Sequence, residues 1–149
     1  MKVLKWLSVA DRLAKAYLDE KLAPLGINSS QHMYILKICA NPGIQQDSLL
    51  ESVYVHPSSI VRVIAALEKK GFLTRMPNES DRRTWRLYPT EKAMAVVEKI
   101  RTACADTEAV LMEGLSGEEQ ADFCAALFHA GKQMAGELQI ERREDEFDE

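Results

Sequence analysis

The chain has 149 residues, of which 46% are hydrophobic and 28% are charged, and its formal net charge is −4 at pH 7. A chain of this size and composition buries enough apolar surface to fold as one domain, which excludes a disulfide scaffold and a disordered protein. Its three cysteines are too widely spaced for a disulfide framework or a zinc knuckle, so we expect free thiols in a reducing compartment. No run of 18 apolar residues occurs, and we therefore expect a cytoplasmic protein with no membrane span.

The first part of the chain is predicted to be helical. Apolar residues at steps of three and four indicate an amphipathic helix over residues 3–21. A second helix is expected over about 29–40, and Asn28 and Gln31 have the spacing of a reciprocal capping box before it.

A helix-turn-helix pattern follows. Residues 45–52 are long enough only for a short helix, and Pro57 suits the first turn of a further helix that runs to Lys70. Gly71 then provides a C-terminal cap. Two helices joined by a tight turn in this way are typical of a helix-turn-helix.

The remaining elements are a hairpin and two long helices. Two short runs rich in β-forming residues, 72–76 and 84–88, flank a polar loop and predict a β-hairpin with a charged tip, which after a helix-turn-helix is a wing. Helices are expected over about 91–113, capped by Thr90, and over 117–138, opened by a capping box. The expected fold is therefore mainly α with a small β-hairpin wing.

The charge is unevenly distributed along this acidic chain. Between His56 and Lys92, eight basic residues occur against four acidic ones. A local basic surface of this kind is what contact with phosphates requires. A solvated charged loop would have the same composition, so charge alone leaves both interpretations open.

Candidate DNA contacts lie on the predicted second helix of the helix-turn-helix. Ser58, Ser59 and Arg62 share an outward face of its first turns. Serine can bind phosphates or base edges, and arginine can form two hydrogen bonds to guanine. The alternative is a solvated helix face with a capping serine.

Further candidates lie on the wing. Arg82 and Arg83 are at its tip, where guanidinium groups can enter a narrow minor groove. Arg75 and Arg86, on the predicted strands, are either phosphate contacts or ordinary edge charges. The alternative for the tip is a surface ion pair of little energetic value.

The order of these motifs resembles the MarR family of transcriptional regulators. The resemblance rests on LEKKGFL at residues 67–73, DRR at 81–83, TEK at 90–92 and the helix start SGEE at 116–119. It covers nearly the whole chain. Three positions depart from the family pattern: Val61, Pro89 and Ala93. Val61 could alter base or phosphate contacts, and the other two lie at the wing exit.

The resemblance implies a winged helix-turn-helix regulator, expected to be a repressor, that binds a pseudo-palindromic double-stranded DNA operator as a homodimer. The DNA-binding lobe would cover residues 28–90, the helical dimerisation region 1–24 and 91–140, and an acidic flexible tail 141–149. Apolar residues on more than one stripe of the terminal helices agree with such a dimer.

The resemblance also implies roles for particular side chains. Arg83 matches the wing arginine, and Asp81 matches the carboxylate that braces the wing. A small anionic aromatic effector would bind in a crevice between the dimer helices and the DNA-binding lobe, where aromatic walls and cations are needed. Five candidates could line it, with plain core and interface packing as the alternative: Trp6, Arg12, Tyr17, His32 and Tyr34.

Other functions remain as alternatives. A thiol- or metal-responsive sensor would use the cysteines, Cys39, Cys104 and Cys124, but none has an adjacent basic residue, and no metal-ligand spacing occurs. A winged helix can also serve as a protein-interaction module. No phosphate loop, nucleophile elbow or other catalytic motif occurs, so we expect no enzyme, no cofactor and no metal.

Overall fold

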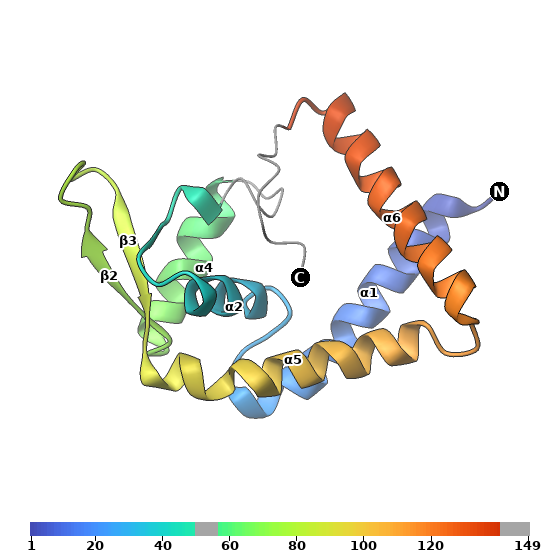
Figure 1. The fold of residues 1–149 in the computed structure, drawn as a ribbon, viewed down its shortest axis with the longest axis horizontal. Helices are drawn as coiled ribbons and strands as arrows, with labels where there is room; N and C mark the ends of the chain where they lie inside the picture. The colour runs from blue at the N-terminus through green and yellow to red at the C-terminus, as the bar shows by residue number, and fades with distance from the viewer. Residues whose placement is uncertain (50–56, 141–149) are drawn as a thin grey trace.

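The computed structural model describes residues 1–49 and 57–140 of the chain (Figure 1). In chain order the elements are α1 (Val3–Leu22), a 3-10 helix (Ala23–Leu25), α2 (His32–Ala40), β1 (Ile44–Gln45), α4 (Pro57–Lys69), β2 (Leu73–Pro77), β3 (Trp85–Pro89), α5 (Glu91–Leu111) and α6 (Gly117–Glu137). The predicted tail 141–149 and the segment 50–56, which includes the end of the predicted short helix, lie outside the described residues.

The wing is an antiparallel sheet of three strands in the order β1-β3-β2. The predicted hairpin is confirmed, with each strand displaced by one residue, and Arg75 pairs with Leu87 at its centre. Strand β1 was not predicted, because a two-residue strand is too short to show alternation; Ile44 pairs with Leu87 on the other edge of β3. The expected short helix therefore does not begin at Gln45, although Ser48 and Leu49 are helical.

The core of the lobe lies between α2, α4 and the sheet. Helix α4 contributes Ile60, Ile64 and Leu67, each at most 1% exposed, at the spacing of one helix face. Buried residues from the other elements complete this cluster, and it continues into α1 and α5: Leu18, Leu22, Ile27, Tyr34, Ile35, Ile38, Leu49, Phe72, Leu73, Leu87, Ala93, Ile100 and Ala103. The winged helix fold predicted from the sequence is thereby confirmed.

The predicted capping box before α2 is wrong. The helix begins at His32 rather than near residue 29, and no side chain caps it. The Asn28 side chain accepts a hydrogen bond from the Ser30 backbone N–H at 3.0 Å. Gln31 does not reach back, because its Oε1 accepts a charge-assisted hydrogen bond from Lys70 Nζ at 3.0 Å.

Both later caps are confirmed. Thr90 accepts a hydrogen bond from the Ala93 N–H at the start of α5. Ser116 and Glu119 form the reciprocal capping box that opens α6. These contacts are local in sequence, which is why spacing alone predicts them.

The terminal helices extend away from the lobe. Helix α5 packs against both α1 and α2, and α6 turns back from its far end (Figure 1). Helix α6 buries none of its residues in this chain. Several apolar residues at the end of α5 and along the last helix are exposed in the single chain: Val110, Leu111, Leu127, Ala130, Met134 and Leu138. The periodicity finds an apolar face but not the surface that covers it.

No helix in the described part of the chain is long and apolar enough to cross a membrane.

Candidate nucleic-acid interface

Helix α4 presents a polar outer face above its buried apolar face. Ser58, Ser59 and Arg62 are exposed on its first turns, next to an exposed Val61. The first turn of a helix also carries the positive end of the helix dipole. This face therefore combines a cation and hydroxyl groups with a favourable dipole, which suits phosphate or base-edge contacts.

The tip of the wing is organised around Asn78, which is only 3% exposed. Its backbone N–H donates to the Thr84 carbonyl at 3.1 Å, and its Nδ2 donates to Thr84 Oγ1 at 3.1 Å. Its Oδ1 accepts from the Ser80 N–H at 3.2 Å. Asn78 was not among the residues predicted from the sequence; the signal for it is an asparagine next to a polar turn, where its side chain can replace backbone partners.

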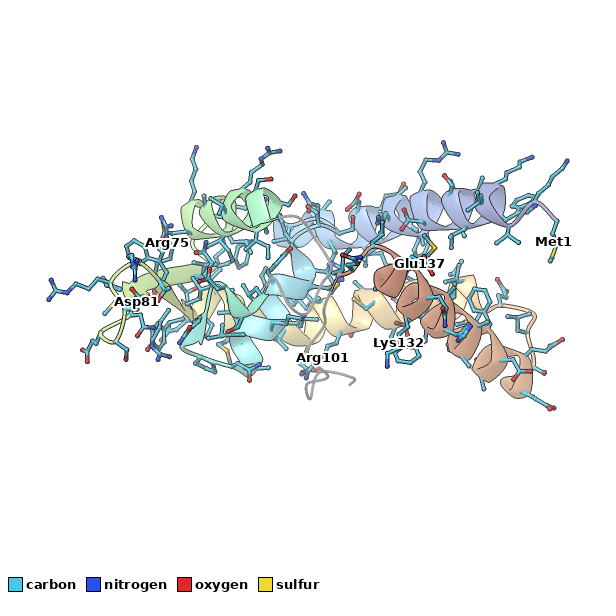
Figure 2. The ribbon with its side chains drawn as sticks, turned by 90° about the horizontal axis from the view of Figure 1, so that it is seen from above. Met1, Arg75, Asp81, Arg101, Lys132 and Glu137 are labelled. Atoms are coloured by element: carbon cyan, nitrogen blue, oxygen red, sulfur yellow. The ribbon has the colours of Figure 1, made fainter. Side chains whose placement is uncertain are left out.

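Asp81 orients one of the two tip arginines. Its Oδ1 accepts from the backbone N–H of Arg83 at 3.1 Å and from Arg83 Nε at 3.3 Å. The Arg83 side chain is nevertheless 92% exposed. Arg82 is exposed as well and makes no hydrogen bond or ion pair with the described residues. The tip thus presents two guanidinium groups to solvent, at the end of the hairpin where Figure 2 labels Asp81.

The two strand arginines are engaged inside the lobe. Arg75 donates from Nε and Nη2 to the two carboxylate oxygens of Glu68, at 3.0 and 3.1 Å, and its guanidinium lies 5.0 Å from the ring centre of Trp85. Figure 2 shows Arg75 between α4 and the hairpin. Arg86 donates from Nη1 to the Gly43 carbonyl at 2.9 Å. Each of these side chains has a partner within the protein.

Two lysines of the basic segment, residues 56–92, also have partners within the protein. Lys70 Nζ donates to the Gly26 carbonyl at 2.8 Å and to Gln31. Lys92 Nζ donates to the Lys70 carbonyl at 2.7 Å and lies over the Phe72 ring. Lys70 therefore ties the end of α4 to the residues just before α2.

Within the basic segment, few cations are therefore left for external partners, and they lie on α4 and the wing. Arg62 and Lys69 on α4, and Arg82 on the wing, make no hydrogen bond or ion pair among residues 1–49 and 57–140, and Arg83 shares only its Nε with Asp81. The cations of the basic segment that no other element of the described structure holds therefore lie on α4 and at the wing tip.

The five predicted effector-binding residues are not brought together. Only Tyr34 lines the pocket of about 340 Å³ between α1, α2 and the start of α4, which has seven lining residues: Lys15, Ser29, Ser30, Met33, Tyr34, Ser59 and Val63. Trp6 lines a separate apolar trough of about 580 Å³ formed by α1, α5 and α6, mainly with Val3, Leu7, Leu111, Phe123 and Leu127.

The other three predicted residues line neither pocket. Arg12 is exposed, and the Tyr17 ring lies 5.3 Å from Lys21 Nζ. His32 is nearly buried, with Nδ1 2.8 Å from the Ser29 carbonyl. Desolvation by burial lowers the pKa of His32, with the Ser29 carbonyl and the charge of Asp19 acting in the opposite direction.

The cysteines lie in different environments. Cys39 and Cys104 are half-buried, and burial raises the pKa of both thiols, with the nearby Glu108 adding to the shift at Cys104. Cys124 is exposed in this chain. Among the described residues, no group of three or more histidine, cysteine or acidic side chains could hold a metal ion.

Comparison with known proteins agrees with this arrangement. The model of the MarR family matches residues 27–85. The uncharacterized HTH-type transcriptional regulator YybA of Bacillus subtilis (strain 168) is 27% identical over 132 residues, which are 89% of this chain and 88% of that protein. The solved transcriptional regulator SlyA has a TM-score of 0.86 at 25% identity, covering 93% of this chain and 98% of its own. MarR has a TM-score of 0.77 at 26% identity, covering 92% and 95%. Residues 27–85 thus match the MarR family, and the chain as a whole has the winged helix fold of the solved SlyA and MarR regulators.

Proposed function

We propose that the protein is a homodimeric repressor that binds a pseudo-palindromic operator in double-stranded DNA. Helix α4 enters the major groove with Ser58, Ser59 and Arg62, and the wing tip places Arg82 and Arg83 in the minor groove. The observation that carries this proposal is the division of the basic segment. Four of its cations have partners on other elements of the lobe, whereas those held by no other element among the described residues lie on α4 and at the wing tip.

The DNA complexes of two solved proteins with the same fold support DNA binding by this chain. A MarR family regulator from Listeria monocytogenes was solved with a 26mer DNA, and a mutant MarR from E. coli was solved with operator DNA. The arginine at the wing tip suits the narrow, strongly negative minor groove, and the exposed first turns of α4 suit base edges in the major groove.

The dimer is proposed from the exposed apolar surface of the terminal helices. The trough between α1, α5 and α6 is almost wholly apolar in its lining, and large apolar side chains around it are exposed: Val3, Leu4, Trp6, Leu7, Leu111, Leu127 and Phe128. A monomer does not leave so much contiguous apolar surface in water without cause. A second copy related by two-fold symmetry covers this surface and places two α4 helices about 34 Å apart on successive major grooves.

A small effector is proposed to bind in the pocket between α1, α2 and α4. Tyr34 supplies an aromatic wall and Lys15 a cation, although Lys15 Nζ also lies 2.9 Å from Asp11. Ser59 belongs both to the wall of this pocket and to the first turn of α4. A ligand here contacts the helix that reads DNA, so it can shift the population of the DNA-binding arrangement.

The experiment that tests the proposal is selection of bound sequences from a random double-stranded DNA pool, followed by titration of the enriched sequences at several salt concentrations. We expect a pseudo-palindrome with half-sites one helical turn apart and an affinity that falls steeply with salt. Absence of enrichment by a folded dimer would contradict the proposal. Salt-insensitive capture of a protein partner would instead favour an interaction module.

A further inference from the structure

One side chain joins α4, the proposed recognition helix, to two strands of the wing, β2 and β3. Arg75 leaves β2 on the same side of the sheet as Leu73 and its cross-strand partner Leu87, both of which are buried against the lobe. From there its guanidinium forms two hydrogen bonds to Glu68 on α4, at 3.0 and 3.1 Å, and lies over the ring of Trp85 on β3. A single planar group therefore contacts α4, β2 and β3.

This contact lies between the apolar core and the wing tip. On β2 and β3, the buried core residues nearest the wing tip are Leu73 and Leu87. Arg75 is two residues nearer the tip than Leu73. A strand rises about 3.3 Å per residue, so the loop that begins at Asn78 starts about 10 Å beyond Arg75. Beyond Leu73 and Leu87, the Glu68–Arg75–Trp85 contact ties the hairpin to α4, while β1 holds the other edge of β3, where the Gln46 N–H donates to the Trp85 carbonyl at 3.0 Å.

Arg75 is poorly suited to bind a phosphate in this arrangement. Its Nε and Nη2 are both directed at Glu68, and one face of the guanidinium is covered by Trp85. The two-point ion pair also cancels the charge of Arg75 against that of Glu68. Arg82, by contrast, is exposed and makes no hydrogen bond or ion pair in the described part of the chain.

We propose that Arg75, held by Glu68 and Trp85, is a positioning residue that sets the angle of the wing against the recognition helix. The inference rests on the proposed DNA-binding function and extends it. Its consequence is that Glu68, an acidic residue on the DNA-facing helix, strengthens DNA binding. Electrostatics alone would give the opposite sign, since removal of a negative charge near DNA favours association.

The test is a double-mutant cycle on the dimer with its selected operator, using Glu68→Gln, Arg75→Gln and the double variant. We expect each single variant to weaken DNA binding about five- to tenfold, and the double variant to be no weaker than either, because the same ion pair is broken in all three. The dependence of log affinity on log salt should keep its slope in all three. The matched control, Arg82→Gln, should make that slope shallower by about 0.9 for each phosphate that Arg82 neutralises.

Two further readouts separate positioning from a role in stability. Hydrogen exchange of the amides of β2 and β3 should rise in Glu68→Gln and Arg75→Gln, and the thermal midpoint should stay far above the assay temperature. The proposal is overturned if Glu68→Gln binds DNA as tightly as the wild type or more tightly, or if Arg75→Gln makes the salt slope shallower as Arg82→Gln does. It is also overturned if wing exchange is unchanged. Failure of the wild-type protein to bind any DNA would refute the proposed function instead, and the exchange experiment would still test the wing contact.

Discussion

Trp6 gives the most direct test of the proposed dimer. It lies on α1 at the apolar trough and is 62% exposed in the single chain. If the trough is covered by a second copy, Trp6 becomes buried in the dimer and Trp6→Ala must weaken association. The chain's other tryptophan, Trp85, lies on the wing and is 39% exposed, which makes Trp85→Ala a matched control.

The expected magnitude follows from the exposed area. A tryptophan buries about 150–250 Å² when it is covered, so the exposed share of Trp6 corresponds to about 120 Å². At about 25 cal/mol per Å², this area contributes about 3 kcal/mol from each protomer. Both copies lose it in a symmetric dimer, and the alanine side chain recovers a small part, which leaves about 5 kcal/mol. The dissociation constant of the dimer should therefore rise by about 10³- to 10⁴-fold.

Sedimentation velocity over a dilution series measures this change. The wild type and Trp85→Ala should remain dimeric at concentrations at which Trp6→Ala is monomeric, while circular dichroism shows that helix content is retained. Operator affinity should fall as the dimer is lost, because one protomer contacts only one half-site. A dissociation constant for Trp6→Ala within threefold of the wild-type value would refute the reasoning, and so would a monomeric wild type at micromolar concentration.

Three further outcomes are expected. Arg83→Ala should weaken operator binding by about 1–3 kcal/mol and leave the dimer intact, as fluorescence anisotropy and sedimentation would show; unchanged affinity would contradict the wing assignment. Burial lowers the pKa of His32 from its ordinary value near 6.5. Below pH 6.5 the unfolded chain therefore binds a proton more readily than the native protein does, and the free energy of unfolding decreases as the pH is lowered. Urea unfolding between pH 7.5 and 5.5 should show a smaller loss of stability for His32→Gln than for the wild type, and equal losses would refute this origin. Finally, burial raises the pKa of the Cys39 and Cys104 thiols, so both should alkylate more slowly in the native than in the unfolded protein. Rapid native alkylation of either would revive the thiol-sensor alternative.

The elements that sequence analysis predicted well are those defined by short-range spacing. Residues three and four apart in α4 identify its buried face, and residues at the start of α5 and α6 identify their caps. The hairpin is also local, since its two strands are joined by one polar loop. The capping box at Asn28 has equally suitable spacing, yet it failed because Gln31 accepts a hydrogen bond from Lys70, 39 residues away.

The same limit applies to the candidate site. Sequence placed Arg62, Arg82 and Arg83 on exposed positions of a helix and a wing, and it treated Arg75 and Arg86 as equivalent charges of undecided role. The structure separates these groups, because Arg75 pairs with Glu68 on α4 and Arg86 donates to a carbonyl 43 residues earlier. It also separates the predicted effector residues, which lie in different parts of the structure.

The sequence by itself determined the resemblance to the MarR family, the order of the elements and the buried face of α4, because periodicity, caps and motif order are properties of neighbouring residues. Only the tertiary structure decided which cations remain unpaired, since an ion pair depends on where distant segments meet. It also decided that the apolar faces of α1 and α6 stay uncovered within one chain. A period of 3.6 residues shows that a helix has an apolar face, but the path of the whole chain determines what covers it.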